Sequence, residues 1–179
     1  MKLLGISGSA AGSKTALTVQ HVLQDTTKQQ TGTDVELLDL KDYQVQFCDG
    51  RDPFTYKGDT KTVIDKVLAA DAFVIGSPVY QGSITGALKN LFDVLPMAAL
   101  RHKVVGIIAN GGSPHHYLAV ENQLRPILSY FRSYIAPGYT YVLKNCFDND
   151  NQLIDPTILE RISILAQEIV TMHQALNEN

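Results

Sequence analysis

The sequence predicts a three-layer α/β domain, in which helices cover both faces of a five-stranded parallel sheet. Short apolar segments alternate with helix-like segments five times along the 179 residues. Three of the strand-like segments are continuously apolar, as expected of strands that are buried on both faces. Glycine, serine and threonine gather after the first, third and fourth strands, so we expect function to lie at those three places.

Composition limits the class of protein. A chain of 179 residues with 45% apolar residues suits one domain over residues 1–179 and excludes overall disorder. The net charge of −3, without a Lys/Arg run, excludes a typical nucleic-acid footprint. No apolar run approaches the ~18 residues of a membrane span. Cys48 and Cys146 show no close pairing motif, which predicts free thiols and a cytoplasmic protein.

The first elements follow from apolar runs and a helix start. Residues 2–7 are apolar and lead into glycine and serine, which predicts a buried strand followed by a loop. Ser13 suits the N-cap of a helix that runs to about Gln30. Residues 34–39 predict a second strand. Residues 40–58 predict a long loop, of a length that is often functional.

The middle of the chain repeats this pattern. Residues 59–70 have apolar positions on one helical face, and residues 71–76 form a third buried strand. A loop over residues 77–83 leads to a helix over residues 84–95. Pro96 ends that helix, because proline cannot continue it.

The fourth strand is predicted over residues 103–109, followed by a loop over residues 110–114. A long helix is expected over residues 115–134. Pro126 lies inside it and should kink it, since a proline in a helix interior removes one backbone hydrogen bond.

A shorter fifth strand over residues 139–142 precedes the last helix. Asp155 at the N-cap and Pro156 at the first helical position start that helix, which runs to about Ala175. Five strands favour the order 2-1-3-4-5 of the flavodoxin-like fold over the six-stranded Rossmann order. Ligands of such sheets bind beyond the carboxyl ends of the strands, here between strands 1 and 3.

The loop after the first strand suits a phosphate. Hydroxyl groups, a lysine and free backbone N–H groups converge at a helix start, where the dipole favours negative charge. The residues are Ser7, Ser9, Ser13, Lys14 and Thr15. A P-loop is excluded, because Ser13 stands where glycine is needed, and GxGxxG is absent as well. A simple capped turn is the open alternative.

The loop after the third strand suits a planar, partly polar ring such as an isoalloxazine, and the two glycines after the fourth strand indicate a close approach or a sharp turn of the backbone. Pro78 fixes one dihedral angle, Tyr80 offers a flat face, and Gly82 permits close approach of the backbone. The candidate residues are Pro78, Val79, Tyr80, Gln81, Gly82, Ser83, Asn110, Gly111, Gly112 and Ser113. The open alternatives are an ordinary half-buried tyrosine and an ordinary strand-to-helix turn.

Other chemistries find little support. His115 and His116 are adjacent and would point apart on a helix, so no metal site is expected. A hydrolase or phosphatase lacks a nucleophile motif, because GxSxG is absent. Cys48, near Arg51, is either a reactive thiol or a small apolar loop residue.

The three loops together resemble the NAD(P)H-dependent FMN reductase family. The match runs from Ser7 to about Val142 and is most specific in SPVYxGSxxGALKNLFD, residues 77–93, and GGSxxHxLAxxxxLRPxL, residues 111–128. Relatives include FMN reductases that serve sulfonate monooxygenases, and azo- and quinone-reducing flavoproteins. Lys14 stands where arginine is common in the family, which replaces a bidentate contact by a point charge.

The resemblance implies hydride transfer from NADPH or NADH to FMN, and then to free flavin, a quinone or an azo compound. Ser9, Ser13, Lys14 and Thr15 would hold the phosphate, while residues 78–83 and 111–113 would enclose the ring. No side chain is assigned as acid, base or nucleophile, because the cofactors carry the chemistry.

The open alternatives are an FMN-binding electron carrier without nicotinamide turnover and a sensor that folds around FMN. Carriers are usually more acidic than −3.

The resemblance also implies a homodimer or homotetramer and, as one partner, a flavin-dependent monooxygenase. The apolar face of Ala87, Leu91, Phe92 and residues 94–100 is either the contact between subunits or ordinary internal packing.

Overall fold

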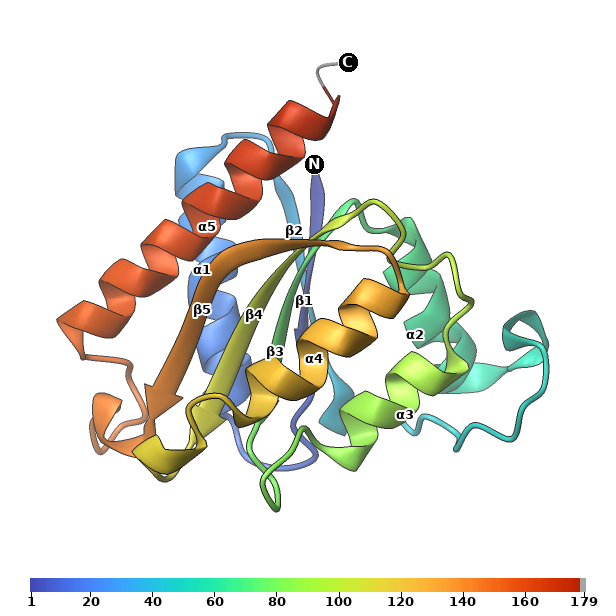
Figure 1. Ribbon diagram of the computed structural model, residues 1–179, viewed down its shortest axis with the longest axis horizontal. Helices are drawn as coiled ribbons and strands as arrows, with labels where there is room; N and C mark the ends of the chain where they lie inside the picture. The colour runs from blue at the N-terminus through green and yellow to red at the C-terminus, as the bar shows by residue number, and fades with distance from the viewer. Residues whose placement is uncertain (178–179) are drawn as a thin grey trace.

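The computed structural model describes residues 1–177 and confirms the predicted parallel sheet (Figure 1). The strand order is β2-β1-β3-β4-β5, and each neighbouring pair is parallel. The strands are β1 (Lys2–Ser7), β2 (Asp34–Asp39), β3 (Ala72–Pro78), β4 (Val104–Gly111) and β5 (Tyr134–Leu143). Their carboxyl ends meet at the lower edge of the sheet in Figure 1.

Helices cover both faces of the sheet (Figure 1). They are α1 (Lys14–Gln29), α2 (Gly58–Ala69), α3 (Gly86–Val94), α4 (Ala119–Tyr130) and α5 (Pro156–Asn177). Four short 3-10 helices lie between them, at Leu40–Asp42, Pro53–Thr55, Pro114–His116 and Lys144–Cys146. None of the helices in residues 1–177 combines the length and the apolar character needed to cross a membrane.

Two hydrophobic cores lie on opposite faces of the sheet. One packs side chains of α2, α3 and α4 against the strands, and the other packs α1 and α5. Most of the apolar side chains of residues 87–100, including Leu91, Phe92 and Leu100, are buried in the first core. Internal packing therefore accounts for this stretch, and the alternative of a contact between subunits does not hold for these buried side chains.

Glycines in the sheet bring α1 close to the strands. A Cβ on Gly5 of β1 would lie 2.6 Å from Val19 Cγ1, and a Cβ on Gly76 of β3 would lie 2.6 Å from Val19 Cγ2. Only glycine allows this approach, because a larger residue would push the helix away. As a result α1 lies across β1 and β3, and its first turn lies at the edge between them.

The predicted boundaries fail in one region. The helix expected over 115–134 is shorter, because Pro114–His116 forms a separate 3-10 turn before α4. The strand expected over 139–142 is longer, because Arg132 takes a left-handed conformation at φ 57° and Tyr134 N–H then donates to Lys103 O at 3.0 Å. This bond begins the pairing of β5 with β4.

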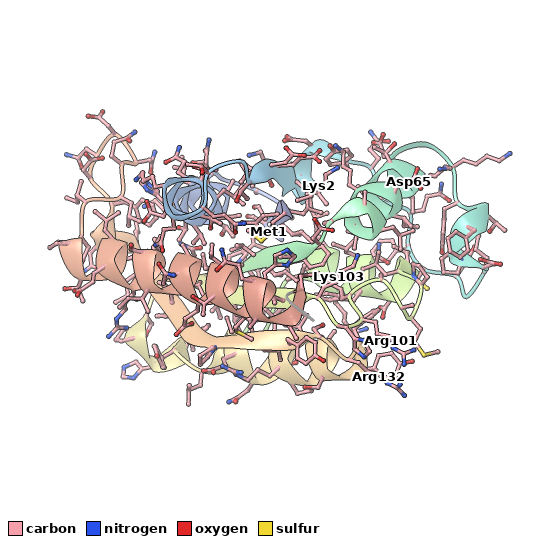
Figure 2. The ribbon with its side chains drawn as sticks, turned by 90° about the horizontal axis from the view of Figure 1, so that it is seen from above. Met1, Lys2, Asp65, Arg101, Lys103 and Arg132 are labelled. Atoms are coloured by element: carbon pink, nitrogen blue, oxygen red, sulfur yellow. The ribbon has the colours of Figure 1, made fainter. Side chains whose placement is uncertain are left out.

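The amino ends of the strands carry basic groups (Figure 2). Met1, Lys2, Arg101, Lys103 and Arg132 are labelled along this edge, opposite to the carboxyl ends. Four of the 15 Lys and Arg residues of the chain thus lie away from the predicted ligand loops, and Asp65 is labelled in the same view.

Candidate functional site

A cavity of about 540 Å³ lies at the carboxyl edge of the sheet. This volume is within the roughly 300–1,000 Å³ of typical small-molecule sites. The loops after β1, β3 and β4 line it together, as the topology predicts for an edge where the strand order reverses. Three segments that are far apart in the sequence therefore form one site.

Most of the predicted site residues line this cavity. They are Ser9, Ser13, Lys14, Thr15, Pro78, Val79, Tyr80, Asn110, Gly111 and Gly112. Five others lie outside its lining, namely Ser7, Gln81, Gly82, Ser83 and Ser113. Ser7 is fully buried at the end of β1. Gln81 and Gly82 form the tip of a turn, with φ of 49° and 76°.

The first turn of α1 offers uncapped backbone donors to the cavity. Ser13 occupies the predicted N-cap position, but its side chain makes no capping hydrogen bond, and the first turn holds no acidic residue. The first N–H groups of a helix have no partner inside the helix, and the dipole there favours an anion. The start of α1 can therefore bind an anionic group of a ligand.

The charge of the lining agrees with an anionic ligand. Lys14 and Lys144 are its two charged residues, and no Asp or Glu occurs among the described residues that line the cavity. Lys14 Nζ lies 4.9 Å from the centroid of the Phe147 ring, which holds the ammonium group beside the start of α1.

The carboxyl end of β5 and the segment after it form a wall that the sequence reasoning missed. Val142, Lys144, Phe147 and Asn151 line the cavity, together with Ala11 and Gly12 of the first loop. Because β5 neighbours β4 and runs parallel to it, its carboxyl end reaches the same edge. Strand order alone could have indicated this wall, although Val142, Phe147 and Asn151 are residue types that carry no ligand signal of their own.

The loop after β3 is a tight hairpin. Tyr80 and Ser83 exchange backbone hydrogen bonds of 2.9 and 3.0 Å, and Val79 N–H donates to Asn110 O at 2.9 Å. The backbone N–H groups of Val79 and Tyr80 are therefore already used in hydrogen bonds within the protein. Gly82 adopts the positive φ that the turn needs, and it does not line the cavity. Tyr80 itself is 43% exposed at the rim of the cavity.

Tyrosines support the loop after β4. Tyr141 Oη donates to Ser113 O at 2.7 Å, and Tyr139 Oη donates to Tyr117 O at 2.7 Å. Burial raises the pKa of both donor phenols, so they stay protonated as donors. A Cβ on Gly111 would lie 1.8 Å from Tyr141 Oη, so only glycine allows the loop to pass this close.

Four buried side-chain oxygens have no hydrogen-bond partner among the described residues, and two of them, on Ser7 and Asn110, belong to predicted site residues. Asn110 Nδ2 donates to Thr18 Oγ1 at 3.0 Å, while Asn110 Oδ1 and Ser7 Oγ accept or donate no hydrogen bond. A buried polar atom without a partner is costly. Asn110 lines the cavity, so a ligand with a polar N–H or O–H group would satisfy its oxygen. The site thus fits a ligand with an anionic end and a polar ring edge.

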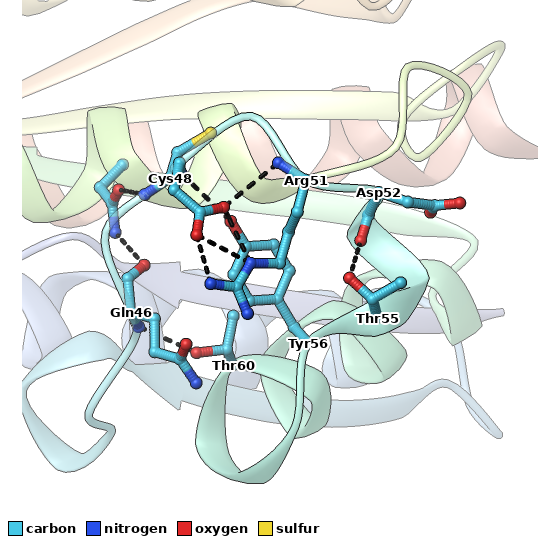
Figure 3. Close-up of polar contacts among 9 residues, drawn as sticks. Gln46, Cys48, Arg51, Asp52, Thr55, Tyr56 and Thr60 are labelled. Carbon is cyan, nitrogen blue, oxygen red and sulfur yellow. Dashed lines mark hydrogen bonds and ion pairs between the residues drawn. The ribbon is translucent and has the colours of Figure 1, made fainter.

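The long loop after β2 is an ordered structure (Figure 3). Cys48 N–H donates to Asn90 Oδ1 at 2.9 Å, and the exposed Cys48 thiol donates to Asp93 O at 3.2 Å. Arg51 pairs with Asp49, and this contact holds the pKa of that carboxyl well below its usual range. The guanidinium group is therefore bound to a carboxylate rather than to the thiol, which removes the basis for a reactive thiol beside Arg51.

Comparison with known proteins agrees with the predicted family. The family model described as NADPH-dependent FMN reductase matches residues 1–148. An NAD(P)H-dependent FAD/FMN reductase from Geobacillus thermodenitrificans is 54% identical over 176 residues, which are 98% of this chain and 95% of the relative. The NADH-dependent FMN reductase SfnF from Pseudomonas putida is 28% identical over 97% of this chain and 94% of its own.

The fold also has close neighbours among solved structures. The apo form of an NADH:FMN oxidoreductase, EMOB, superimposes with a TM-score of 0.76 and 23% identity, over 99% of this chain and 91% of its own. A flavodoxin from the domain Archaea superimposes with a TM-score of 0.66 and 13% identity, over 97% and 99% of the two chains. These likenesses confirm the flavodoxin-like fold.

Proposed function

Because the chain belongs to the NADPH-dependent FMN reductase family, we propose that the cavity at the carboxyl edge holds FMN for reduction by NADPH or NADH. One observation carries the assignment to this cavity. The start of α1 has no side-chain cap, and the cavity beside it is lined by two lysines and, among the described residues, by no carboxylate. This combination of donors and positive charge suits the phosphate of a flavin mononucleotide.

The residues of the chain then have binding and positioning roles. The first turn of α1 and Lys14 hold the phosphate, and Asn110 Oδ1 accepts a hydrogen bond from a polar edge of the ligand. Pro78, Val79 and Gly111 form walls on either side of the ring. The bound flavin supplies the hydride chemistry, so the protein contributes position and exclusion of water.

An electron carrier without nicotinamide turnover is the second candidate for this cavity. A net charge of −3 is modest for such a carrier. The relative that is 54% identical is named a reductase for FAD and FMN, which supports turnover and a flavin acceptor here. Oxidation of NADPH, followed by absorbance of the nicotinamide with and without FMN, separates the two candidates.

The phosphate assignment is tested by two substitutions of one exposed residue. Ser13→Asp and Ser13→Asn both give good N-cap residues, so both should preserve α1. Only aspartate adds a negative charge beside the phosphate. We expect Ser13→Asp to weaken FMN binding at least tenfold and Ser13→Asn to weaken it little, with both read by calorimetry.

Riboflavin, which lacks the phosphate, is the ligand control. Its affinity should be the same in both variants. Equal FMN affinity in the aspartate and asparagine variants would remove the phosphate from the start of α1, and with it the placement of the flavin in this cavity.

We also propose a single domain over residues 1–179, a homodimer or homotetramer, a cytoplasmic location and a flavin-dependent monooxygenase as one recipient of reduced flavin. Exposed aromatic side chains, such as Phe47 and Phe54 of the loop after β2, support a subunit contact away from the buried stretch 87–100. Sedimentation analysis tests the assembly.

A further inference from the structure

Lys14 brings a positive charge to the first turn of α1, but no carboxylate holds it. Its side chain lines the cavity, and it forms no ion pair with an Asp or Glu of residues 1–177. A lysine side chain that is free in solution samples many rotamers, and a ligand that fixes one of them loses affinity by roughly two- to tenfold. An anion site that uses Lys14 therefore gains affinity if the ammonium group is already held in place.

An aromatic ring holds this ammonium group instead. Lys14 Nζ lies 4.9 Å from the centroid of the Phe147 ring, and a cation–π contact extends to about 6 Å. A carboxylate partner would cancel the charge of Lys14 and compete with an anionic ligand. The ring carries no net charge and occupies one side of the ammonium group, so the charge and the remaining N–H donors stay available to a ligand.

The Phe147 ring is itself fixed by the fold. It is 7% exposed and packs in the core that contains Leu153 and the apolar side of α5. The backbone around it is closed by a bridge between Phe147 and Leu153 and by a hydrogen bond of 3.0 Å from Asp148 N–H to Gln152 O. The ring belongs to the segment after β5, whereas Lys14 belongs to α1. Phe147 is thus a rigid support for a side chain of another element.

We propose that Phe147 is a positioning residue of the anion site, which holds the Lys14 ammonium group at the cavity before a ligand arrives. The inference rests on the proposed function, in which the phosphate of FMN is the anion. Because the contact with Phe147 already restricts the rotamers of Lys14, less conformational entropy is lost when the phosphate binds. Phe147 therefore raises the affinity for the phosphate through Lys14, although it has no hydrogen-bonding side chain of its own.

A direct contact between Phe147 and the flavin is the other explanation for an effect on binding, since the ring also lines the cavity. The two explanations predict different results. A direct contact with the isoalloxazine or the ribityl chain acts on FMN and on riboflavin alike, and it persists without Lys14. An action through Lys14 needs both the phosphate and the lysine.

Three substitutions of Phe147 separate its aromatic face from its apolar bulk. Phe147→Leu and Phe147→Met keep an apolar side chain and remove the ring, and methionine adapts to irregular space if the leucine variant does not fold. Phe147→Tyr keeps the aromatic face and is the rescue variant. Phe73→Leu is the matched control, because Lys103 Nζ lies 5.6 Å from the centroid of the Phe73 ring and neither residue lines the cavity.

FMN and riboflavin are titrated by calorimetry into each variant free of flavin, after circular dichroism has shown that it is folded. We expect Phe147→Leu and Phe147→Met to raise the Kd for FMN roughly three- to tenfold, and to leave the Kd for riboflavin within about twofold of wild type. Phe147→Tyr and Phe73→Leu should leave both Kd values within about twofold of wild type. In a Lys14→Met background, Phe147→Leu should change the Kd for FMN by less than about twofold.

Four outcomes overturn the proposal. Wild-type FMN affinity in Phe147→Leu and Phe147→Met means that Lys14 needs no support. Equal weakening of FMN and riboflavin assigns Phe147 to direct contact with the flavin. A loss that persists in the Lys14→Met background shows that Phe147 acts without the lysine, and an equal loss in Phe73→Leu shows a general effect on the fold. A wild-type chain that binds neither FMN nor riboflavin removes the proposed function itself.

Discussion

Gly111→Ala should destabilise the protein through Tyr141. The new Cβ would lie 1.8 Å from Tyr141 Oη and 2.5 Å from its Cζ, so the ring must move. Tyr141 is 5% exposed and its ring lies 5.7 Å from that of Tyr117, so it has little room to move. Overpacking of this kind costs about 1–3 kcal/mol. Loss of the hydrogen bond from Tyr141 to Ser113 adds about 0.5–1.5 kcal/mol.

Replacing glycine also restricts the unfolded chain, which returns about 0.4–1 kcal/mol. The net loss in the free energy of unfolding is therefore on the order of 2–3 kcal/mol, and a domain of this size should lose on the order of 10 °C in Tm. The chain has no tryptophan, so urea unfolding is best followed by far-ultraviolet circular dichroism.

Gly112→Ala is the matched control, because a Cβ there has no atom within 4 Å. Its stability should stay within about 0.5 kcal/mol of wild type. Tyr141→Phe removes only the hydroxyl group, so it should cost about 0.5–1.5 kcal/mol. The double variant should remain destabilised, because the Cζ contact persists. If Gly111→Ala is as stable as Gly112→Ala, the close packing of this loop on Tyr141 is refuted.

Three further predictions test other parts of the structure. Lys14→Ala should weaken FMN binding more at low salt than at high salt, because salt screens a solvated charge contact; an equal loss at both salts contradicts the phosphate role. Asp155→Ala should lower the free energy of unfolding by about 1 kcal/mol, because Asp155 Oδ1 accepts a capping hydrogen bond from Thr157 N–H at 2.9 Å at the start of α5. Asp155→Asn should keep most of this stability, because asparagine is also a good N-cap residue. Burial lowers the pKa of His21 below 6.5, so the unfolded chain binds a proton at His21 more tightly than the folded chain does. The free energy of unfolding should therefore fall as pH drops through 6.5. In urea titrations at several pH values, His21→Gln should make the free energy of unfolding depend less on pH.

The sequence predicted local structure well where short-range rules govern it. The apolar runs of β1 and β3 and the Asp155–Pro156 start of α5 lie where they were expected, because burial and helix capping depend on adjacent residues. The boundary between α4 and β5 was wrong. There the hydrogen bond from Tyr134 to Lys103, which are distant in the chain, decides where the strand begins.

The candidate site shows the same division. The predicted parallel sheet placed the loops after β1, β3 and β4 at one edge. Strands joined by right-handed helical crossovers run parallel, so their carboxyl ends all lie at the same edge of the sheet. The wall after β5 escaped notice, since Val142 and Phe147 are ordinary apolar residues in the sequence and only packing brings Phe147 beneath Lys14.

By itself, then, the sequence determined the fold and the family, and it predicted the edge of the sheet at which the cavity lies, because each rests on local patterns and on motifs in the strand-end loops. The tertiary structure alone decided which donors remain free. The N–H of Val79 is taken by Asn110, whereas the first turn of α1 stays uncapped. Hydrogen bonds between distant segments are long-range choices, and no local pattern of residues encodes them.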